Sequence, residues 1–395
     1  MSARPLIVVS SVIANKPHNG GNARMVLNWL EGLQRLGADT FLIEQIASPT
    51  CSDDAGRPVA ASGSVNQKYF ESVLQSHGFS DRAALLCDAG DSLAGATIHG
   101  ASATELHDLA RDADLLINIS GHLAIPALLQ RFERKAYVDL DPGYTQFWHA
   151  GSPGSARLDG HDIYFTVGQR VGTADCSIPT EGIVWHPIRQ PIVLDRCDGS
   201  PQVSHDRFTT IASWRGAYAP VTCDGETYRV KAHEFRKIVE LPRVSNHRFE
   251  AALDIHPGDS KDLDALRTAG WDVVDPRTVA DTPERYCAYI EQSAAECSAA
   301  QGMYVQTRSG WFSDRTARYL AAGKPALVQD TGFSLPDSTG EGLVTFSTLA
   351  EAAAGADRIA RDYRTHSEAA RDLAERYFDS TTELGQLLER AGVSM

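Results

Sequence analysis

Residues 308–336, RSGWFSDRTARYLAAGKPALVQDTGFSLP, include the side chains and amides best suited to bind an anion. The sequence predicts a turn and then a helix whose first backbone amides belong to Ser313, Asp314, Arg315 and Thr316. The first amides of a helix have no partner inside it, and together with the helix dipole they favour a negative group. We therefore expect these four residues to contact an anion, although Asp314 would also serve simply as a helix cap.

The same segment delivers polar residues to the end of a strand. Gly323 is suited to end the helix, and Pro325 begins a predicted strand that runs to Gln329 and Asp330. In open parallel sheets, ligands bind at the carboxyl ends of the strands. We expect Asp330 to face the same ligand as the start of the helix.

Two basic residues lie at the end of a strand and at the start of the next helix, earlier in the second half of the chain. Arg215 follows a predicted strand over residues 207–214, and Lys231 opens the helix after it, in VKAHEFRK. Arginine offers a planar fork of donors and lysine a point charge, which are complementary ways to hold a phosphate. The two side chains could therefore hold a phosphate, although by themselves they would be interpreted as solvated surface charges.

A glycine-rich loop follows the first predicted strand. It reads HNGGN and contains His18, Gly20 and Gly21. The two glycines permit close approach of a sugar or a diphosphate to the backbone. The loop lacks the G-x-G-x-x-G spacing of dinucleotide folds, which argues against a nicotinamide cofactor.

Two further strand ends in the first half supply candidate bases. One predicted strand leads into His122, and another ends in DLDPGY, which contains Asp139 and Asp141. A hydroxyl has a high pKa, so a base must lie near it if the hydroxyl is to attack in a single displacement. We rank the candidates Asp141, Asp139, His122 and His18. Asp141 precedes a proline and would also suit a plain turn.

Strand and helix patterns alternate through both halves of the chain, which predicts two Rossmann-like βαβ domains. A polar segment around residues 197–207 indicates the linker between them. In the second half we predict a helix over residues 282–300 and a strand over 303–307, and residues from 349 onward are helical.

The run ARYLAAGKPALVQDTG, residues 317–332, resembles the donor-binding segment of GT-B glycosyltransferases of the family 1 and family 4 type. In that family a loop and helix end in an A-C-G-K-P-V-like turn before a strand. This sequence departs from the family at Arg318 and Gly310, where a glutamate is usual. Asp314 and Asp330 are the candidate substitutes.

The resemblance implies an α/β GT-B architecture, in which two Rossmann-like domains face a cleft and a C-terminal helix crosses back. Residues 1–200 would bind the acceptor, residues 201–379 the nucleotide sugar, and residues 380–395 would pack on the first domain. It also implies an enzyme that transfers a sugar from a UDP, GDP or TDP donor, with Arg215 and Lys231 holding the diphosphate. No metal and no further cofactor is expected, and a retaining course would need no dedicated base.

Composition limits the partners. The 395 residues exceed a single core of roughly 250–300 residues, and 37 basic against 51 acidic residues give a net charge of −14. This charge opposes binding to nucleic acid or to anionic membranes, so we expect a small soluble acceptor. Seven scattered cysteines without a CxxC pair, and no apolar run long enough for a signal peptide or a membrane span, predict a cytoplasmic protein.

Two other functions fit the same sequence. A sugar-nucleotide epimerase or hydrolase would attack the same diphosphate bond without an external acceptor. A non-catalytic partner protein would use the scaffold without binding a donor. The sequence leaves the donor sugar, the nucleobase, the acceptor, the stereochemical course and the oligomeric state open.

Overall fold

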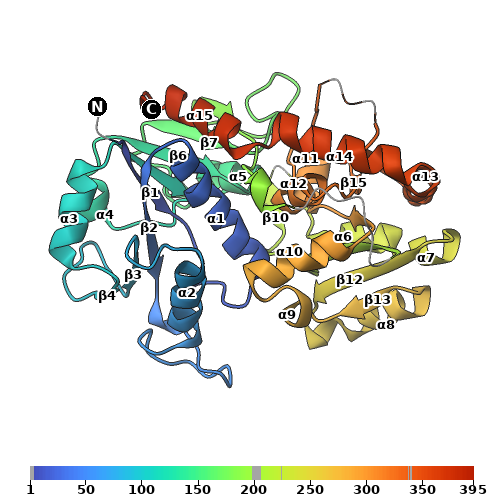
Figure 1. Ribbon diagram of the computed structural model, residues 1–395, viewed down its shortest axis with the longest axis horizontal. Coiled ribbons are helices and arrows are strands. Elements are labelled where there is room, and N and C mark those ends of the chain that lie inside the picture. Colours follow the sequence, from blue (N-terminus) through green and yellow to red (C-terminus); the bar gives the residue numbers. More distant parts are fainter. Residues whose placement is uncertain (1–3, 198–205, 224, 337, 339) are drawn as a thin grey trace.

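The computed structural model describes residues 4–197, 206–223, 225–336, 338 and 340–395. Two sheets, one mostly and one wholly of parallel strands, lie side by side and are covered by helices, which gives the molecule two halves (Figure 1). The linker predicted around residues 197–207 lies largely outside the described residues.

The first half contains an eight-stranded sheet in the order β4-β3-β2-β1-β5-β6-β7-β8. All neighbouring pairs are parallel except β3 and β4. Short apolar runs such as LIVVS form strands that are buried on both faces, as parallel sheets require. The strands are β1 (Leu6–Ser10), β2 (Asp39–Ile46), β3 (Ala83–Cys87), β4 (Thr97–His99), β5 (Leu115–Ile119), β6 (Lys135–Asp139), β7 (Ile163–Thr166) and β8 (Trp185–Pro187).

Helices cover both faces of this sheet. Successive side chains of its strands point to opposite faces, and the side chains on both faces are apolar. Ile7 and Val9 join the apolar cluster that contains the first helix, whereas Val8 joins a cluster on the other face with Leu106 and Leu128. The helices are α1 (Gly20–Arg35), α2 (Val65–Ser76), α3 (Ala103–Asp112), α4 (Pro126–Leu129) and α5 (Tyr144–Gly151).

The second half contains a six-stranded, wholly parallel sheet in the order β13-β12-β9-β14-β15-β16. The chain moves outward from β9 on one side and from β14 on the other, so the strand order reverses between these two strands. Such a switch point opens a crevice at the carboxyl ends of the strands. The strands are β9 (Arg207–Ser213), β12 (Arg248–Asp254), β13 (Asp272–Val274), β14 (Ala295–Ser298), β15 (Ala326–Gln329) and β16 (Leu343–Phe346).

A small hairpin and a series of helices complete the second half. The hairpin, β10 (Val221–Cys223) and β11 (Glu226–Tyr228), is inserted after β9. The helices are α6 (Lys231–Phe235), α7 (Leu241–Val244), α8 (Ser260–Ala269), α9 (Pro276–Val279), α10 (Pro283–Gln292), α11 (Gly302–Thr307), α12 (Asp314–Ala321), α13 (Leu349–Arg361), α14 (Tyr363–Tyr377) and α15 (Ser380–Arg390).

Two elements of the second half differ from the sequence prediction. The helix predicted over residues 282–300 ends at Gln292, and residues 295–298 form β14 between β9 and β15. The strand predicted over 303–307 is the helix α11. The place in the sheet beside β9 is already taken by β14, so the apolar run of α11 packs as a helix instead.

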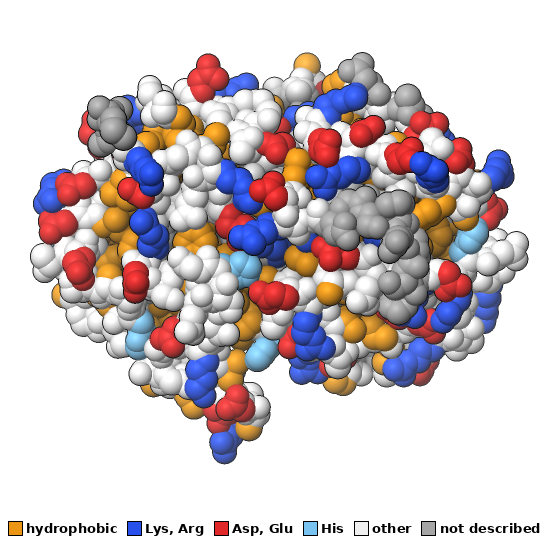
Figure 2. Space-filling view, viewed as in Figure 1, with side chains coloured by type: hydrophobic (Ala, Val, Ile, Leu, Met, Phe, Trp, Pro, Cys, Tyr) orange, Lys and Arg blue, Asp and Glu red, His pale blue; other side chains and the backbone are white. Residues whose placement is uncertain are grey.

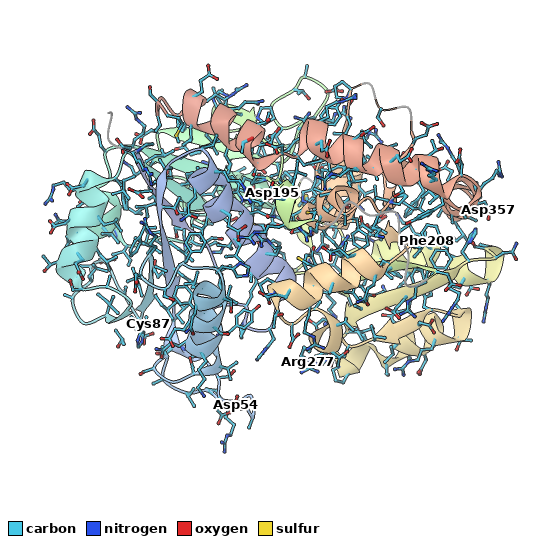
Figure 3. The ribbon with its side chains drawn as sticks, in the orientation of Figure 1. Asp54, Cys87, Asp195, Phe208, Arg277 and Asp357 are labelled. Atoms are coloured by element: carbon cyan, nitrogen blue, oxygen red, sulfur yellow. The ribbon has the colours of Figure 1, made fainter. Side chains whose placement is uncertain are left out.

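The last helix crosses back to the first half. Figure 1 shows α13 and α14 over the second sheet and α15 over the first. Leu384, Leu387 and Leu388 of α15 belong to the same buried cluster as Leu30 and Leu33 of α1. Nearby, Asp195, labelled in Figure 3, accepts a hydrogen bond from Arg35 of α1 at 2.8 Å.

Basic and acidic side chains are intermixed over the face shown in Figure 2 rather than gathered in areas of one sign. Among the described helices, none is both long enough and apolar enough to cross a bilayer.

The close contact between α1 and α15 yields a stability prediction. A Cβ added at Gly32 would lie 2.7 Å from Leu384 Cδ1 and 2.8 Å from Ser380 Cβ. We expect Gly32→Ala to lower the free energy of unfolding by about 1–3 kcal/mol, measured by urea denaturation, because the two helices must move apart.

The matched control is Gly385→Ala in α15, where no heavy atom lies within 4 Å of the added Cβ. This change should stabilise the protein slightly, since alanine favours a helix over glycine. Equal stability of the two variants would contradict the close packing of α1 against α15.

Candidate active site

At the switch point, the loop after β9 packs against the loop after β14 through a contact between Gly216 and Gln301 that only glycine permits. A Cβ on Gly216, whose φ is +82°, would lie 1.7 Å from Gln301 Nε2. The Oε1 atom of Gln301 in turn accepts a hydrogen bond from the backbone N–H of Lys231 at 2.7 Å. The loops after β9 and β14 are thereby joined, and the start of α6 is fixed beside them.

Lys231 lies in a cluster of charged side chains. Burial and the positive charge of Arg315 lower the pKa of the Lys231 ammonium to about 7, against the opposing effect of Asp314, Glu296 and Asp141. An amine in this setting gains its full charge when an anion comes to lie beside it.

Arg315 is the second cation of this cluster and is held rigidly. Its Nε donates to Glu296 Oε1 at 2.7 Å, and its Nη1 donates to the carbonyl oxygen of Ile211 at 2.8 Å. The guanidinium therefore links the first turn of α12 to the ends of β9 and β14. Glu296 is fully buried, so the ion pair is shielded from water.

Arg215, predicted as the partner of Lys231, makes a different contact. Its guanidinium donates to both carboxylate oxygens of Asp259, from Nε at 2.8 Å and from Nη2 at 2.7 Å. Asp259 at the start of α8 holds the arginine in this structure, and the diphosphate clamp predicted for Arg215 and Lys231 stays a prediction. In the structure the cation grouped with Lys231 is Arg315.

The first turn of α12 lies near the carboxyl ends of the strands, and its residues differ in exposure. Ser313 and Thr316 are buried and Asp314 is partly exposed, with a pKa that burial raises. Ser313 is the N-cap residue, yet its side chain makes no capping hydrogen bond. Asp330 follows β15 and accepts hydrogen bonds from Arg308 Nη1 at 3.0 Å and from the Gly332 amide at 2.8 Å.

Asp139 has a structural place rather than a catalytic one. It is fully buried and accepts hydrogen bonds from the hydroxyls of Thr145 and Thr166 at 2.6 and 2.7 Å, and from Gln146 Nε2 at 2.9 Å. Its Oδ1 also accepts a hydrogen bond from the backbone N–H of Asp141 at 3.0 Å. Burial raises its pKa. The base role predicted for Asp139 does not fit, since a substrate cannot reach this carboxylate; it shapes the turn that presents Asp141.

Asp141 joins the two halves of the molecule. Its Oδ2 accepts a hydrogen bond from the Tyr218 hydroxyl at 2.9 Å, and its Oδ1 accepts one from the Tyr304 hydroxyl at 2.6 Å. Both tyrosines belong to the second half, and Asp141 also interacts electrostatically with Lys231. The charge of this carboxylate therefore acts on Lys231 at the switch point.

The two histidines differ in setting. Burial, with the charges of Lys16 and Arg157, lowers the pKa of His122 to about 4, so its imidazole is neutral at pH 7. His18 is exposed, has a positive φ of 59°, and its ring centroid lies 5.6 Å from that of Tyr69. No hydrogen bond joins either ring to Lys231 or Arg315 in the described part of the chain.

Gly20 and Gly21 serve a contact between the halves. The Gly20 amide donates to the Ala280 carbonyl at 2.9 Å, and a Cβ on Gly20 would lie 2.0 Å from the Thr282 oxygen. A Cβ on Gly21 would lie 2.9 Å from the ring of Tyr286. Protein atoms of the second half occupy the space that the two glycines leave in this structure, and the donor contact predicted for them stays a prediction.

Sequence reasoning missed Glu44, which holds the loop after β1. Its carboxylate is fully buried and accepts hydrogen bonds from the amides of Ile13, Ala14 and Asn15 at 2.7, 2.8 and 2.7 Å. Burial nevertheless raises its pKa to about 7. The sequence contained one indication of this role, because Glu44 is a single acidic residue inside an otherwise apolar strand pattern.

Four other site residues were missed: Tyr218, Gln301, Tyr304 and Glu296. Glu296 had the same kind of signal, a lone carboxylate in the strand AECS. The tyrosines and the glutamine had none, because their partners lie far away in the sequence.

Among the described residues, no three His, Cys, Asp or Glu side chains are grouped in a way that would hold a metal ion. Metal independence stays a prediction from the sequence.

Comparison with known proteins finds similarity in structure alone. No protein-family model and no curated protein sequence matches the chain. An alpha-glucosyltransferase in complex with UDP and a 13-mer DNA is 10% identical, covers 99% of this chain and 100% of its own, and has a TM-score of 0.57. Anabaena Alr3699/HepE in complex with UDP and glucose is 13% identical over 98% of this chain and 100% of its own, with a TM-score of 0.59.

A sucrose-phosphate synthase from Thermosynechococcus elongatus is also similar, with 11% identity over 98% of this chain and 99% of its own, and a TM-score of 0.52. These similarities extend over almost the whole chain, and at such low identity they establish the fold. The GT-B fold predicted from the sequence, with two Rossmann-like halves and a crossover helix, is confirmed.

The buried Glu44 gives a prediction with a defined pH window. Its pKa is about 7 in the folded protein and 4.5 when exposed, so unfolding releases a proton between these values. The stability due to this group is complete below about pH 4.5 and is lost as the pH rises through 7. Glu44→Gln keeps a neutral side chain throughout.

We expect the difference in unfolding free energy between wild type and Glu44→Gln to shrink by about 2.5 kcal/mol from pH 5 to pH 8, measured by urea denaturation. A difference that stays constant with pH would mean that the three amides keep the carboxylate charged over the whole range.

Proposed function

We propose that this chain is a glycosyltransferase that moves a sugar from a nucleoside-diphosphate sugar to an acceptor hydroxyl. The observation that carries the proposal is the electrostatic interaction of Lys231 with Arg315, in the first turn of α12, and with Asp141 of the opposite half. Cations at the strand ends and a carboxylate from the opposite half are the two components that sugar transfer needs.

Lys231 and Arg315 would bind the donor diphosphate and stabilise it as it leaves. Negative charge increases on the diphosphate when its bond to the sugar breaks, and fixed cations stabilise that state most strongly. Arg315 is held in place by Glu296 and Ile211, so it needs no reorganisation. These cations supply the charge that a metal ion would otherwise bring, which supports a reaction without metal or further cofactor.

Asp141 would act on the acceptor. The acceptor oxygen forms the new bond to the anomeric carbon while the bond from that carbon to the phosphate oxygen breaks. In an inverting course the hydroxyl proton passes to Asp141, and in a retaining course it passes to the departing phosphate while Asp141 orients the hydroxyl. The hydroxyls of Tyr218 and Tyr304 hold the carboxylate until an acceptor hydroxyl replaces one of them.

UDP is the donor nucleotide that we favour over GDP and TDP, because the alpha-glucosyltransferase and HepE structures contain it. One of these similar structures also contains DNA. The net charge of −14 and the mixed charges in Figure 2 instead support a small acceptor for this chain.

A nucleotide-binding experiment tests the donor site. We expect UDP, among UDP, GDP and TDP, to raise the melting temperature. Lys231→Met and Arg315→Lys should each weaken UDP binding about 10- to 100-fold, since each loses charge-assisted contacts to phosphate. Arg215→Ala should bind UDP normally, because Asp259 already neutralises this arginine.

Arg364→Ala is the matched surface control, with a side chain that is 86% exposed and pairs only with Glu368 in the described structure. Asp141→Asn should keep UDP binding but lower sugar transfer about 100-fold or more. Normal UDP binding by Lys231→Met and Arg315→Lys would disprove the donor site, and rapid nucleotide release without any acceptor would favour a hydrolase.

The pKa of Lys231 predicts how donor binding depends on pH. With a pKa of about 7, its ammonium is mostly charged at pH 6 and mostly neutral at pH 8. UDP-glucose is a suitable probe, since its diphosphate keeps a constant charge over this range. Its affinity should fall roughly tenfold from pH 6 to pH 8 in titration calorimetry.

Lys231→Met should bind UDP-glucose weakly, with little change over the same range. The same pH dependence in Lys231→Met and in the wild type would show that another group titrates.

A further inference from the structure

A cavity of about 510 Å³ lies on the β12 side of the switch point, and neither Lys231 nor Arg315 lines it. The loop after β9, the first turns of α6 and the start of α8 form its walls. Its volume is within the usual range for small-molecule sites. The side chains that decide its chemistry are Trp214, Arg215, Tyr218, His233, Arg236 and Asp259.

The charges around this cavity are balanced. Arg215 pairs with Asp259 through two hydrogen bonds, and Arg236 pairs with Asp262 in the same way at 2.9 and 2.6 Å. Each guanidinium is already neutralised by an aspartate, so an anionic ligand would gain little there. Each pair still offers N–H donors and carboxylate lone pairs, which suit a ligand with hydroxyl groups.

One buried polar atom in the wall has no partner in the described structure. This atom is Nδ1 of His233. A buried nitrogen without a hydrogen bond is destabilising, and a neutral imidazole nitrogen can either donate to or accept from a hydroxyl. Nδ1 itself has almost no exposed surface, so a ligand would reach it only after the ring turns, but the His233 side chain lines the cavity and brings a neutral hydrogen-bonding ring to its wall.

The rest of the lining is apolar. Val230, Pro220 and the ring of Tyr218 contribute, with Ala217, Ala219 and Ala232. Apolar walls combined with convergent donors and acceptors, at no net charge, match a sugar ring, which alternates C–H surface and hydroxyls.

Tyr218 connects this cavity to the proposed reaction centre. Its side chain lines the cavity, and its hydroxyl donates to Asp141 Oδ2 at 2.9 Å. A sugar in the cavity could displace the Tyr218 hydroxyl and present one of its own to Asp141.

We propose that this cavity binds an uncharged saccharide, and that this saccharide is the acceptor. The second part rests on the proposed glycosyltransferase function. The acceptor site would then combine Asp141 of the first half with Arg236 and His233 of the second half, while the donor diphosphate binds at Lys231 and Arg315.

Direct binding tests the saccharide site independently of turnover. Saturation-transfer NMR with the UDP-loaded protein would use glucose, galactose, mannose, N-acetylglucosamine, their methyl glycosides, maltose and cellobiose. Glucose 6-phosphate and glucuronate are the charged counterparts. We expect at least one neutral sugar to bind, and Arg236→Met and His233→Phe to weaken it at least tenfold without changing UDP affinity or the melting temperature of the free protein.

Arg364→Ala is again the surface control and should bind both ligands normally. Loss of UDP affinity in Arg236→Met and His233→Phe would identify the cavity as part of the donor site and overturn the proposal. Binding of charged sugars alone, of no sugar, or of a neutral sugar that both variants bind normally would also overturn it. If UDP fails to bind any form, the proposed function falls, and the same NMR experiment without UDP still decides the saccharide site.

Discussion

The buried ion pair between Arg315 and Glu296 is the interaction on which the candidate site depends. It brings the first turn of α12 to the ends of β9 and β14, because Arg315 also donates to the Ile211 carbonyl. Removing one partner of a buried pair leaves an uncompensated charge, at a cost of about 3–5 kcal/mol. The pair therefore fixes one cation firmly, and Lys231, held through Gln301, lies beside it with a pKa that reflects the neighbouring charge.

The site exists only where the two halves meet. Asp141 of the first half accepts hydrogen bonds from the hydroxyls of Tyr218 and Tyr304 in the second half. The Gly20 amide of the first half donates a hydrogen bond to the Ala280 carbonyl of the second. Such contacts bring together side chains that neither half could assemble by itself. Entry of a donor and an acceptor would require these contacts to open, as in enzymes that close over their substrates.

Local sequence patterns did not show which partners the predicted residues would meet. Arg215 was grouped with Lys231 because both follow β9, but Asp259, 44 residues further on, holds the arginine. Asp139 and Asp141 share one face of a strand pattern, yet burial removes the first from any substrate. The five residues 303–307 suit a strand by composition, but β14 already fills that place in the sheet.

The crossover of the last helix was implied only by the resemblance to the GT-B fold. The sequence by itself determined the two βαβ halves and the helix at Asp314 that ends near Gly323. These features follow from hydrophobic period, glycine and proline placement, and capping residues, which act over a few positions along the chain. Only the tertiary structure decided which charges are paired, which carboxylate is accessible, and where the saccharide-sized cavity lies. Ion pairing and burial depend on distances between residues remote in sequence, and no local pattern encodes those distances.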